Sequence, residues 1–136
     1  KMLDGAGIGA VIICPSNPYV SIAPMLAIPA FGDFIKSRKV PVAAVSPIVG
    51  GKAIKGPAAK MMAELGMEIS ALGIARHYIG LIDGIVIDDA DRDLIGAIDE
   101  LGIKVLVTNT IMSSLADKSR LAEQTVAFAH TLKAAT

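Results

Sequence analysis

Short apolar runs rich in Val and Ile recur along the chain, and longer stretches with helical spacing of apolar residues separate them. The runs occupy residues 10–14, 40–46, 84–87 and 104–107. A short continuous apolar run is typical of a strand that is buried on both faces of a sheet. The pattern therefore predicts four buried strands.

The stretches between the runs predict helices. These are expected at residues 24–38, 57–65, 70–78 and 91–101, and from Ser113 or Ser114 to about residue 134. In the first helix, three apolar side chains should face inward and three basic ones outward: Phe31, Phe34 and Ile35, against Lys36, Arg38 and Lys39.

Helix boundaries are marked by residues with known end preferences. Pro57 suits a first helical turn and Ser70 is a candidate N-cap, whereas Gly66 and Gly102 are candidate C-terminal stops. Strands that alternate with helices imply right-handed crossovers between parallel strands. The predicted fold is α/β, with a doubly wound, mainly parallel sheet and Rossmann-like layering, in a single domain over residues 1–136.

The segment after the first strand holds the first candidate site. Pro15, Pro18 and Pro24 each remove a backbone donor and fix φ, so the strand must end in a rigid loop. Ligands of open α/β sheets bind just outside the carboxyl ends of the strands. The uncharged hydrogen-bonding groups of this loop suit a phosphate or a ribose, and the candidate contacts are Ser16, Asn17, Pro18 and Ser21.

A second loop, predicted over residues 46–57, follows the second strand. Its glycines let backbone amides approach a ligand, its lysines add positive charge, and a helix is expected to start just after Gly56. The alternative is a tight turn with solvated lysines. Beside the first loop an anion site is the better interpretation, with Ser46, Gly50, Gly51, Lys52, Lys55 and Gly56 as its candidates.

Other polar positions are weaker candidates. Residues 108–112 follow the last strand and should lie at the same sheet edge, while Arg76 and His77 could contact phosphate from a helix face. The acidic cluster of Asp83, Asp88, Asp89, Asp91 and Asp93 could hold a metal. It is more simply explained by helix capping, with Asp89 or Asp91 as the cap.

The composition narrows the functional class. The chain has 136 residues, 53% hydrophobic and 19% charged, which indicates a globular protein with a sizeable core. Its 13 basic and 13 acidic residues cancel, so no electrostatic argument favours nucleic acid. No apolar stretch is long enough to predict a membrane span. The single cysteine, Cys14, excludes an internal disulfide and is expected to be structural, as Met61, Met62 and Met67 are expected to pack in the core.

Several segments resemble the 2-phospho-L-lactate transferase family. They are Val11–Pro18 with Ser21-Ile22, Ala44–Ala53, Lys55–Ala58, Ser70–Arg76, Asp83–Asp88 and Val105–Thr108. The resemblance covers nearly the whole chain, and the second loop is its most specific part.

The resemblance implies an activity and its reagents. Members of the family transfer a phospholactyl or phosphoenolpyruvyl group from a guanosine diphosphate conjugate to the deazaflavin alcohol Fo. They release GMP, use magnesium, and make a precursor of the deazaflavin coenzyme F-420. We therefore expect a cytoplasmic transferase that binds this donor and Fo and forms a homodimer at full length.

The resemblance also implies that this chain matches only the C-terminal half of the family. The metal ligands and much of the Fo pocket belong to the other half, so neither set can be placed on residues here. Two residues depart from the family's pattern: Ala23 stands where glycine is expected, and Asn109 stands where aspartate is expected. We expect the isolated chain to be inactive and prone to self-association. The alternative function is a non-catalytic nucleotide- or sugar-phosphate-binding module on the same fold.

Overall fold

The computed structural model describes residues 7–37, 39–53 and 56–132 and contains a four-stranded main sheet. Its strands are β1 (Val11–Ile13), β2 (Val42–Val45), β5 (Gly84–Asp88) and β6 (Lys104–Thr108), in the spatial order β1-β2-β5-β6. Every neighbouring pair is parallel, and the register places Ile13 opposite Ala44, Ala44 opposite Ile85, and Ile85 opposite Val105. The predicted α/β fold with a mainly parallel sheet is confirmed.

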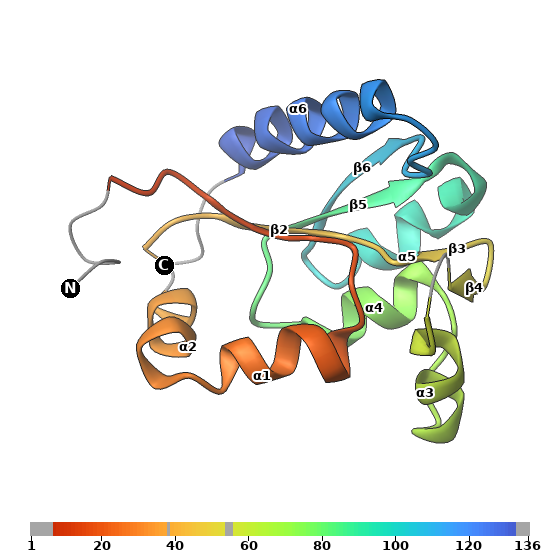
Figure 1. The fold of residues 1–136 in the computed structure, drawn as a ribbon, viewed down its shortest axis with the longest axis horizontal. Helices are drawn as coiled ribbons and strands as arrows, with labels where there is room; N and C mark the ends of the chain where they lie inside the picture. The colour runs from red at the N-terminus through yellow and green to blue at the C-terminus, as the bar shows by residue number, and fades with distance from the viewer. Residues whose placement is uncertain (1–6, 38, 54–55, 133–136) are drawn as a thin grey trace.

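Helices cover both faces of this sheet (Figure 1). The connections lie on one face: η1 (Pro18–Ile22), α1 (Ala23–Leu26), α2 (Pro29–Lys36), α3 (Ala58–Glu64), α4 (Ala71–His77), η2 (Asp89–Leu94) and α5 (Ile95–Asp99). The opposite face is covered by α6 (Leu115–Thr131). Among the described helices no single one has the length and apolarity to cross a membrane; Pro18–Leu26 and Pro29–Lys36 meet those criteria only as a pair bent by 93°.

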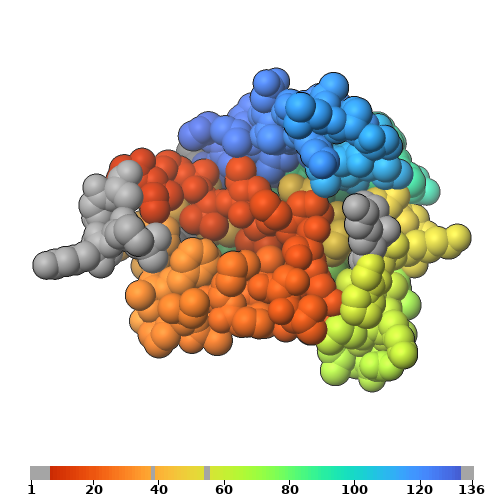
Figure 2. Space-filling view, in the orientation of Figure 1, coloured from red at the N-terminus to blue at the C-terminus, as the bar shows by residue number. Residues whose placement is uncertain are grey.

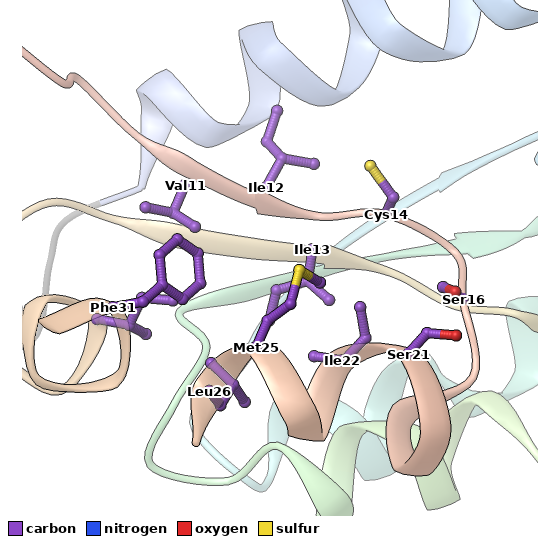
Figure 3. Close-up of a pocket in the computed structure, with 11 residues that line it drawn as sticks. Val11, Ile12, Ile13, Cys14, Ser16, Ser21, Ile22, Met25, Leu26 and Phe31 are labelled. Carbon is purple, nitrogen blue, oxygen red and sulfur yellow. The ribbon is translucent and has the colours of Figure 1, made fainter. Parts of the chain in front are cut away.

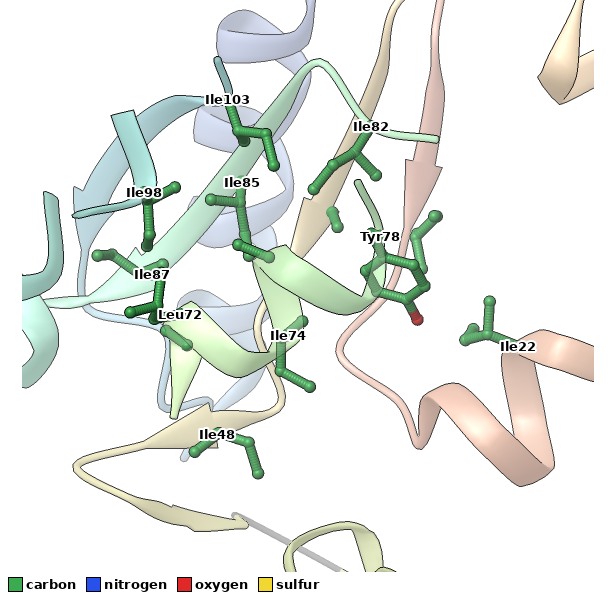
Figure 4. Close-up of a cluster of buried hydrophobic side chains, with 14 of the residues drawn as sticks. Ile22, Ile48, Leu72, Ile74, Tyr78, Ile82, Ile85, Ile87, Ile98 and Ile103 are labelled. Carbon is green, nitrogen blue, oxygen red and sulfur yellow. The ribbon is translucent and has the colours of Figure 1, made fainter. Parts of the chain in front are cut away.

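Alternate residues of the central strands serve the two faces. On β2, Val42 and Ala44 belong to the larger core with Ile85 and Ile87 of β5, part of which Figure 4 shows. Their neighbours Ala43 and Val45 pack on the other face, toward α6. Gly84 allows α6 to come close, because a Cβ there would lie 2.8 Å from side-chain atoms of Phe128 and Leu132. The continuous apolar runs are thus explained by burial on both sides.

Several predicted boundaries are confirmed at their caps. The Ser70 hydroxyl accepts the N–H of Gly73 at the start of α4, and Ser114, rather than Ser113, caps α6. Gly66 and Gly102 have φ of 70° and 80° just past their helices, as left-handed C-terminal stops require. Phe31, Phe34 and Ile35 pack against the core, while Lys36 and Lys39 are exposed. Arg38 lies outside the described residues.

Three predicted elements differ from the structure. The helix expected over 24–38 breaks at Ile28, whose ψ of 116° is extended because a residue before proline is disfavoured in the helical region. The helix expected at 91–101 starts earlier, as the 3-10 turn η2, and is α-helical only over Ile95–Asp99. The loop expected over 46–57 contains a hairpin, β3 (Ile48–Val49) paired antiparallel with β4 (Lys52–Ala53).

The edge strand β1 has apolar pockets on both sides. The pocket toward α1 and α2 has a volume of about 310 Å³ and includes Val11, Met25 and Phe31 in its lining (Figure 3). The pocket toward α6 has a volume of about 270 Å³, and Ile12 and Cys14 line both. Figure 2 shows the β1 segment, in red, on the molecular surface between the helices of the two faces. An uncovered strand with apolar flanks is suited to adding a further strand.

We predict that the chain self-associates through this edge. Replacing Ile12 with lysine should shift the protein toward monomer in sedimentation velocity, because a charge on an edge strand opposes strand addition. Leu65→Lys is the matched control, since Leu65 is 60% exposed and lies at the end of α3. A parent protein that stays monomeric at every concentration, or an equal effect of both variants, would contradict this prediction.

Candidate functional site

The loop after β1 is shaped by the Asn17 side chain. Its Oδ1 accepts the N–H groups of Tyr19 and Val20, at 2.9 and 3.3 Å, and so caps the π-helical turn η1. Its Nδ2 donates to the sulfur of Met61 at 3.3 Å. Pro18 is the buried first residue of the turn. The carboxamide that sequence reasoning assigned to a ligand is therefore already used within the protein, and it holds the loop in place.

The two serines of this loop have free hydroxyls. Within the described part of the chain, neither Ser16 nor Ser21 makes a side-chain hydrogen bond. Ser21 is exposed and Ser16 half-buried, and both line the pocket beneath β1 (Figure 3). These hydroxyls are available to a ligand at the carboxyl end of the strand. Cys14, just past β1, lines the same pocket and is exposed.

The second loop carries the β3–β4 hairpin. Gly50 and Gly51, with φ of 57° and 79°, form the two-residue turn that joins its strands. Ser46 is fully buried, and its hydroxyl donates to the carbonyl of Ile48 at 3.0 Å and accepts the Ile48 N–H at 3.1 Å. Lys52 is exposed and forms no ion pair with any described residue. Lys52 thus offers a free charge, whereas Ser46 is committed to the hairpin.

The two loops start side by side. Since Ile13 pairs with Ala44 in parallel register, both strands end at the same edge of the sheet. The Asn17–Met61 contact and a hydrogen bond from the Tyr19 hydroxyl to the Met67 sulfur join the first loop to α3 and the segment after it. Of the three methionines expected in the core, Met62 is fully buried and Met67 packs against the core, whereas Met61 is half-buried and belongs to no core cluster among the described residues.

The end of the second loop gives little support to the predicted anion site. Gly56, with φ of 73°, precedes α3, which has only seven residues and no side-chain N-cap. So short a helix offers a weak dipole for an anion. Lys55 lies outside the described residues.

The segment after β6 is tied to the protein interior. Asp88 accepts the N–H of Thr110 at 2.8 Å and its hydroxyl at 3.2 Å. Arg120 of α6 donates to the carbonyl of Asn109 at 2.9 Å. In the strand order, β6 is also the described strand farthest from β1. The segment nevertheless lies at the predicted edge of the sheet, because β6 is parallel to β5, and its Met112 lines the pocket toward α6 together with Cys14 and Pro15.

The acidic cluster divides into separate structural roles. The cap of η2 is Asp88, which accepts the Ala90 N–H at 3.0 Å, so the expected cap at Asp89 or Asp91 is wrong by one to three positions. Asp89 pairs with Arg92 at 3.3 Å, and Asp83 accepts the Val42 N–H at 2.8 Å. Among the residues that the structure describes, no group of three or more His, Cys, Asp or Glu side chains is placed to hold a metal ion.

Asp91 has a role that sequence reasoning missed. Its two carboxylate oxygens lie 3.1 and 3.2 Å from the backbone nitrogen of Gly50, at the tip of the hairpin. Burial raises the pKa of Asp91, and the nearby Asp88 carboxylate raises it further, while the Gly50 amide opposes both effects. No local signal predicts a contact between residues so distant in the chain.

The Arg76–His77 pair lies at the end of α4. Arg76 is paired with Glu68 at 2.9 Å. The His77 ring is edge-on to Tyr19 and Tyr78, with centroids 5.1 and 5.0 Å apart, and burial lowers its pKa. The charge of Arg76 is therefore already countered, and His77 packs beside the first loop.

We predict that Asp91→Asn changes how stability depends on pH. The pKa of Asp91 is higher in the folded than in the unfolded protein, so its ionisation disfavours the folded state as pH rises through that pKa. Asparagine keeps an acceptor for Gly50 but cannot ionise. The melting temperature of the variant should therefore rise relative to that of the parent as the pH increases from about 3 to 7. A melting temperature of the parent that instead rises relative to that of the variant over this range would contradict the prediction.

Comparisons with known proteins match most of this chain. The profile of the family described as 2-phospho-L-lactate transferase CofD matches residues 6–129. The 2-phospho-L-lactate transferase of Methanocaldococcus jannaschii is 43% identical over 122 residues, which cover 90% of this chain and 38% of that protein. The one from Methanothermobacter thermautotrophicus is 44% identical over 112 residues, covering 82% and 36%.

A bacterial relative carries a different name. The phosphoenolpyruvate transferase of Streptomyces coelicolor is 34% identical over 136 residues, covering 98% of this chain and 43% of that protein. The chain thus spans less than half the length of each of these relatives. With a profile match over most of its length, this chain belongs to the 2-phospho-L-lactate transferase (CofD) family.

Proposed function

We propose that this chain forms the donor-nucleotide part of an enzyme that transfers a phospholactyl or phosphoenolpyruvyl group to the deazaflavin Fo. The donor would be the matching guanosine diphosphate conjugate, GMP would be released, and the product would lead to coenzyme F-420. Membership of the family supports the transfer, since relatives are named as phospholactate and phosphoenolpyruvate transferases. The observation that carries the proposal is the pair of loops at the carboxyl ends of β1 and β2.

Sheet topology supports a site beside β1. Ligands of doubly wound sheets bind where the strand order reverses. In the described sheet the order runs in one direction, from β1 through β2 and β5 to β6. A further strand beside β1 that reverses this order would place the switch point next to the loop that carries Ser16 and Ser21.

The available groups suit a nucleoside diphosphate. The hydroxyls of Ser16 and Ser21 would hydrogen-bond ribose or phosphate oxygens, and Lys52 would supply a point charge to the diphosphate. Asn17 and Ser46 would act indirectly, by holding η1 and the hairpin. In the transfer, a ribityl hydroxyl oxygen of Fo would bond to phosphorus as the bond to the GMP oxygen breaks, and the hydroxyl proton would pass to water. Positioning and charge stabilisation dominate such chemistry.

The described residues do not fit a magnesium site. Asp88 and Asp91 direct their oxygens to backbone N–H groups, and Asp89 is paired with Arg92. We therefore assign no magnesium ligand to this part of the chain and derive no step through the metal.

The direct test is an assay of the full-length protein with Fo and each guanylylated donor. The proposal expects GMP and the phospholactyl or phosphoenolpyruvyl product of Fo. GDP binding without turnover of either donor would instead support the alternative, a non-catalytic nucleotide- or sugar-phosphate-binding module.

We predict that Lys52→Ala and Asn17→Ala both weaken GDP binding to the full-length protein, by about tenfold or more. Lysine removal deletes a charged contact worth ~1.5–3 kcal/mol, and Asn17→Ala deletes the cap that shapes the first loop. Lys60→Ala is the matched control, because Lys60 is exposed on α3. Isothermal titration measures the affinities. A GDP affinity of Lys52→Ala equal to that of the parent would show that the second loop does not contribute Lys52 to the binding site.

We also predict that residues 1–136 alone release no GMP from the donor, with or without Fo. Among the described residues, no group of three or more His, Cys, Asp or Glu side chains is placed to hold a metal ion. Measurable GMP release from the purified chain would contradict this prediction and transfer the chemistry to residues such as Lys52, Lys55 or Arg76.

A further inference from the structure

The β3–β4 hairpin is too short to hold its own shape. Each strand has two residues, and Val49 pairs with Lys52 across the Gly50–Gly51 turn. Isolated hairpins are marginal in water even when longer. The base of this one is fixed, because Ile48 is fully buried and Ser46 bonds to its backbone. The tip needs a separate anchor.

Asp91 is that anchor. It lies in η2, 41 residues further along the chain, and is 6% exposed. Both of its carboxylate oxygens face the Gly50 N–H, which is the one hydrogen-bond donor to this side chain within the described residues. A buried carboxylate with a single donor is poorly compensated for its lost hydration. The contact is thus a poor source of stability, although it joins the tip of the hairpin to η2.

We infer that Asp91 is a positioning residue: its carboxylate holds the Gly50–Gly51 turn so that the neighbouring Lys52 stands at the carboxyl edge of β2, ready for a donor phosphate. The inference rests on the proposed function. The Gly50 N–H already donates to Asp91 and is not available to a phosphate. The group that the hairpin presents to a phosphate is therefore the ammonium group of the exposed Lys52.

The test compares three variants of the full-length protein. Asp91→Ala removes the anchor, Asp91→Asn keeps an acceptor of the same shape, and Asp89→Ala is the matched control on η2, where Asp89 is exposed and pairs with Arg92. GDP affinity and hydrogen exchange at the Gly50 amide are measured for each. We expect Asp91→Ala to lose about tenfold in affinity and to exchange faster at Gly50, and Asp91→Asn to restore both. Asp89→Ala should match the parent.

Parent-like GDP affinity or unchanged Gly50 exchange in Asp91→Ala would overturn the inference, as would failure of Asp91→Asn to rescue. If the parent itself does not bind GDP, the proposed function fails, and with it the role assigned to Lys52; exchange at Gly50 then decides alone whether Asp91 holds the turn. If Asp91→Ala does not fold, Asp91→Glu carries the same test, because its longer side chain displaces the carboxylate. Parent-like affinity in that variant would also contradict the inference.

Discussion

The parallel pairing of β1 with β2 is the constraint on which the rest of this structure depends. Because Ile13 lies opposite Ala44, the two strands end together and release their loops at one edge of the sheet. Burial of β2 on both faces holds this register, since a slip by one residue would exchange Val42 and Ala44 with Ala43 and Val45 between the two cores. The free hydroxyls of the first loop and the lysine of the second therefore belong to loops that leave the same edge of the sheet.

The fold could be predicted from the sequence because its signals are local and strong. Runs of Val and Ile mark strands that are buried on both sides, and Gly66, Ser70 and Gly102 mark helix ends by their conformational preferences. The hairpin escaped prediction because strands of two residues leave no periodic pattern, even though Gly50-Gly51 is a turn signal.

The candidate site was predictable in position but not in detail. Prolines and glycines indicate where the two loops begin, but they do not show which polar groups are already used. Asn17 bonds to Met61, and Asp91 bonds to Gly50, through contacts between segments that are distant in sequence. Such contacts require the tertiary structure. They separate the groups that shape the loops from Ser16, Ser21 and Lys52, which remain open to a ligand.

The most direct test of the account is a GDP titration of the ¹⁵N-labelled full-length protein, followed by amide chemical shifts. The account predicts saturable changes concentrated at residues 16–21 and 50–52, at the carboxyl ends of β1 and β2. Changes that instead concentrate after β6, around Asn109 and Arg120, or at the Arg76–His77 end of α4, would contradict it.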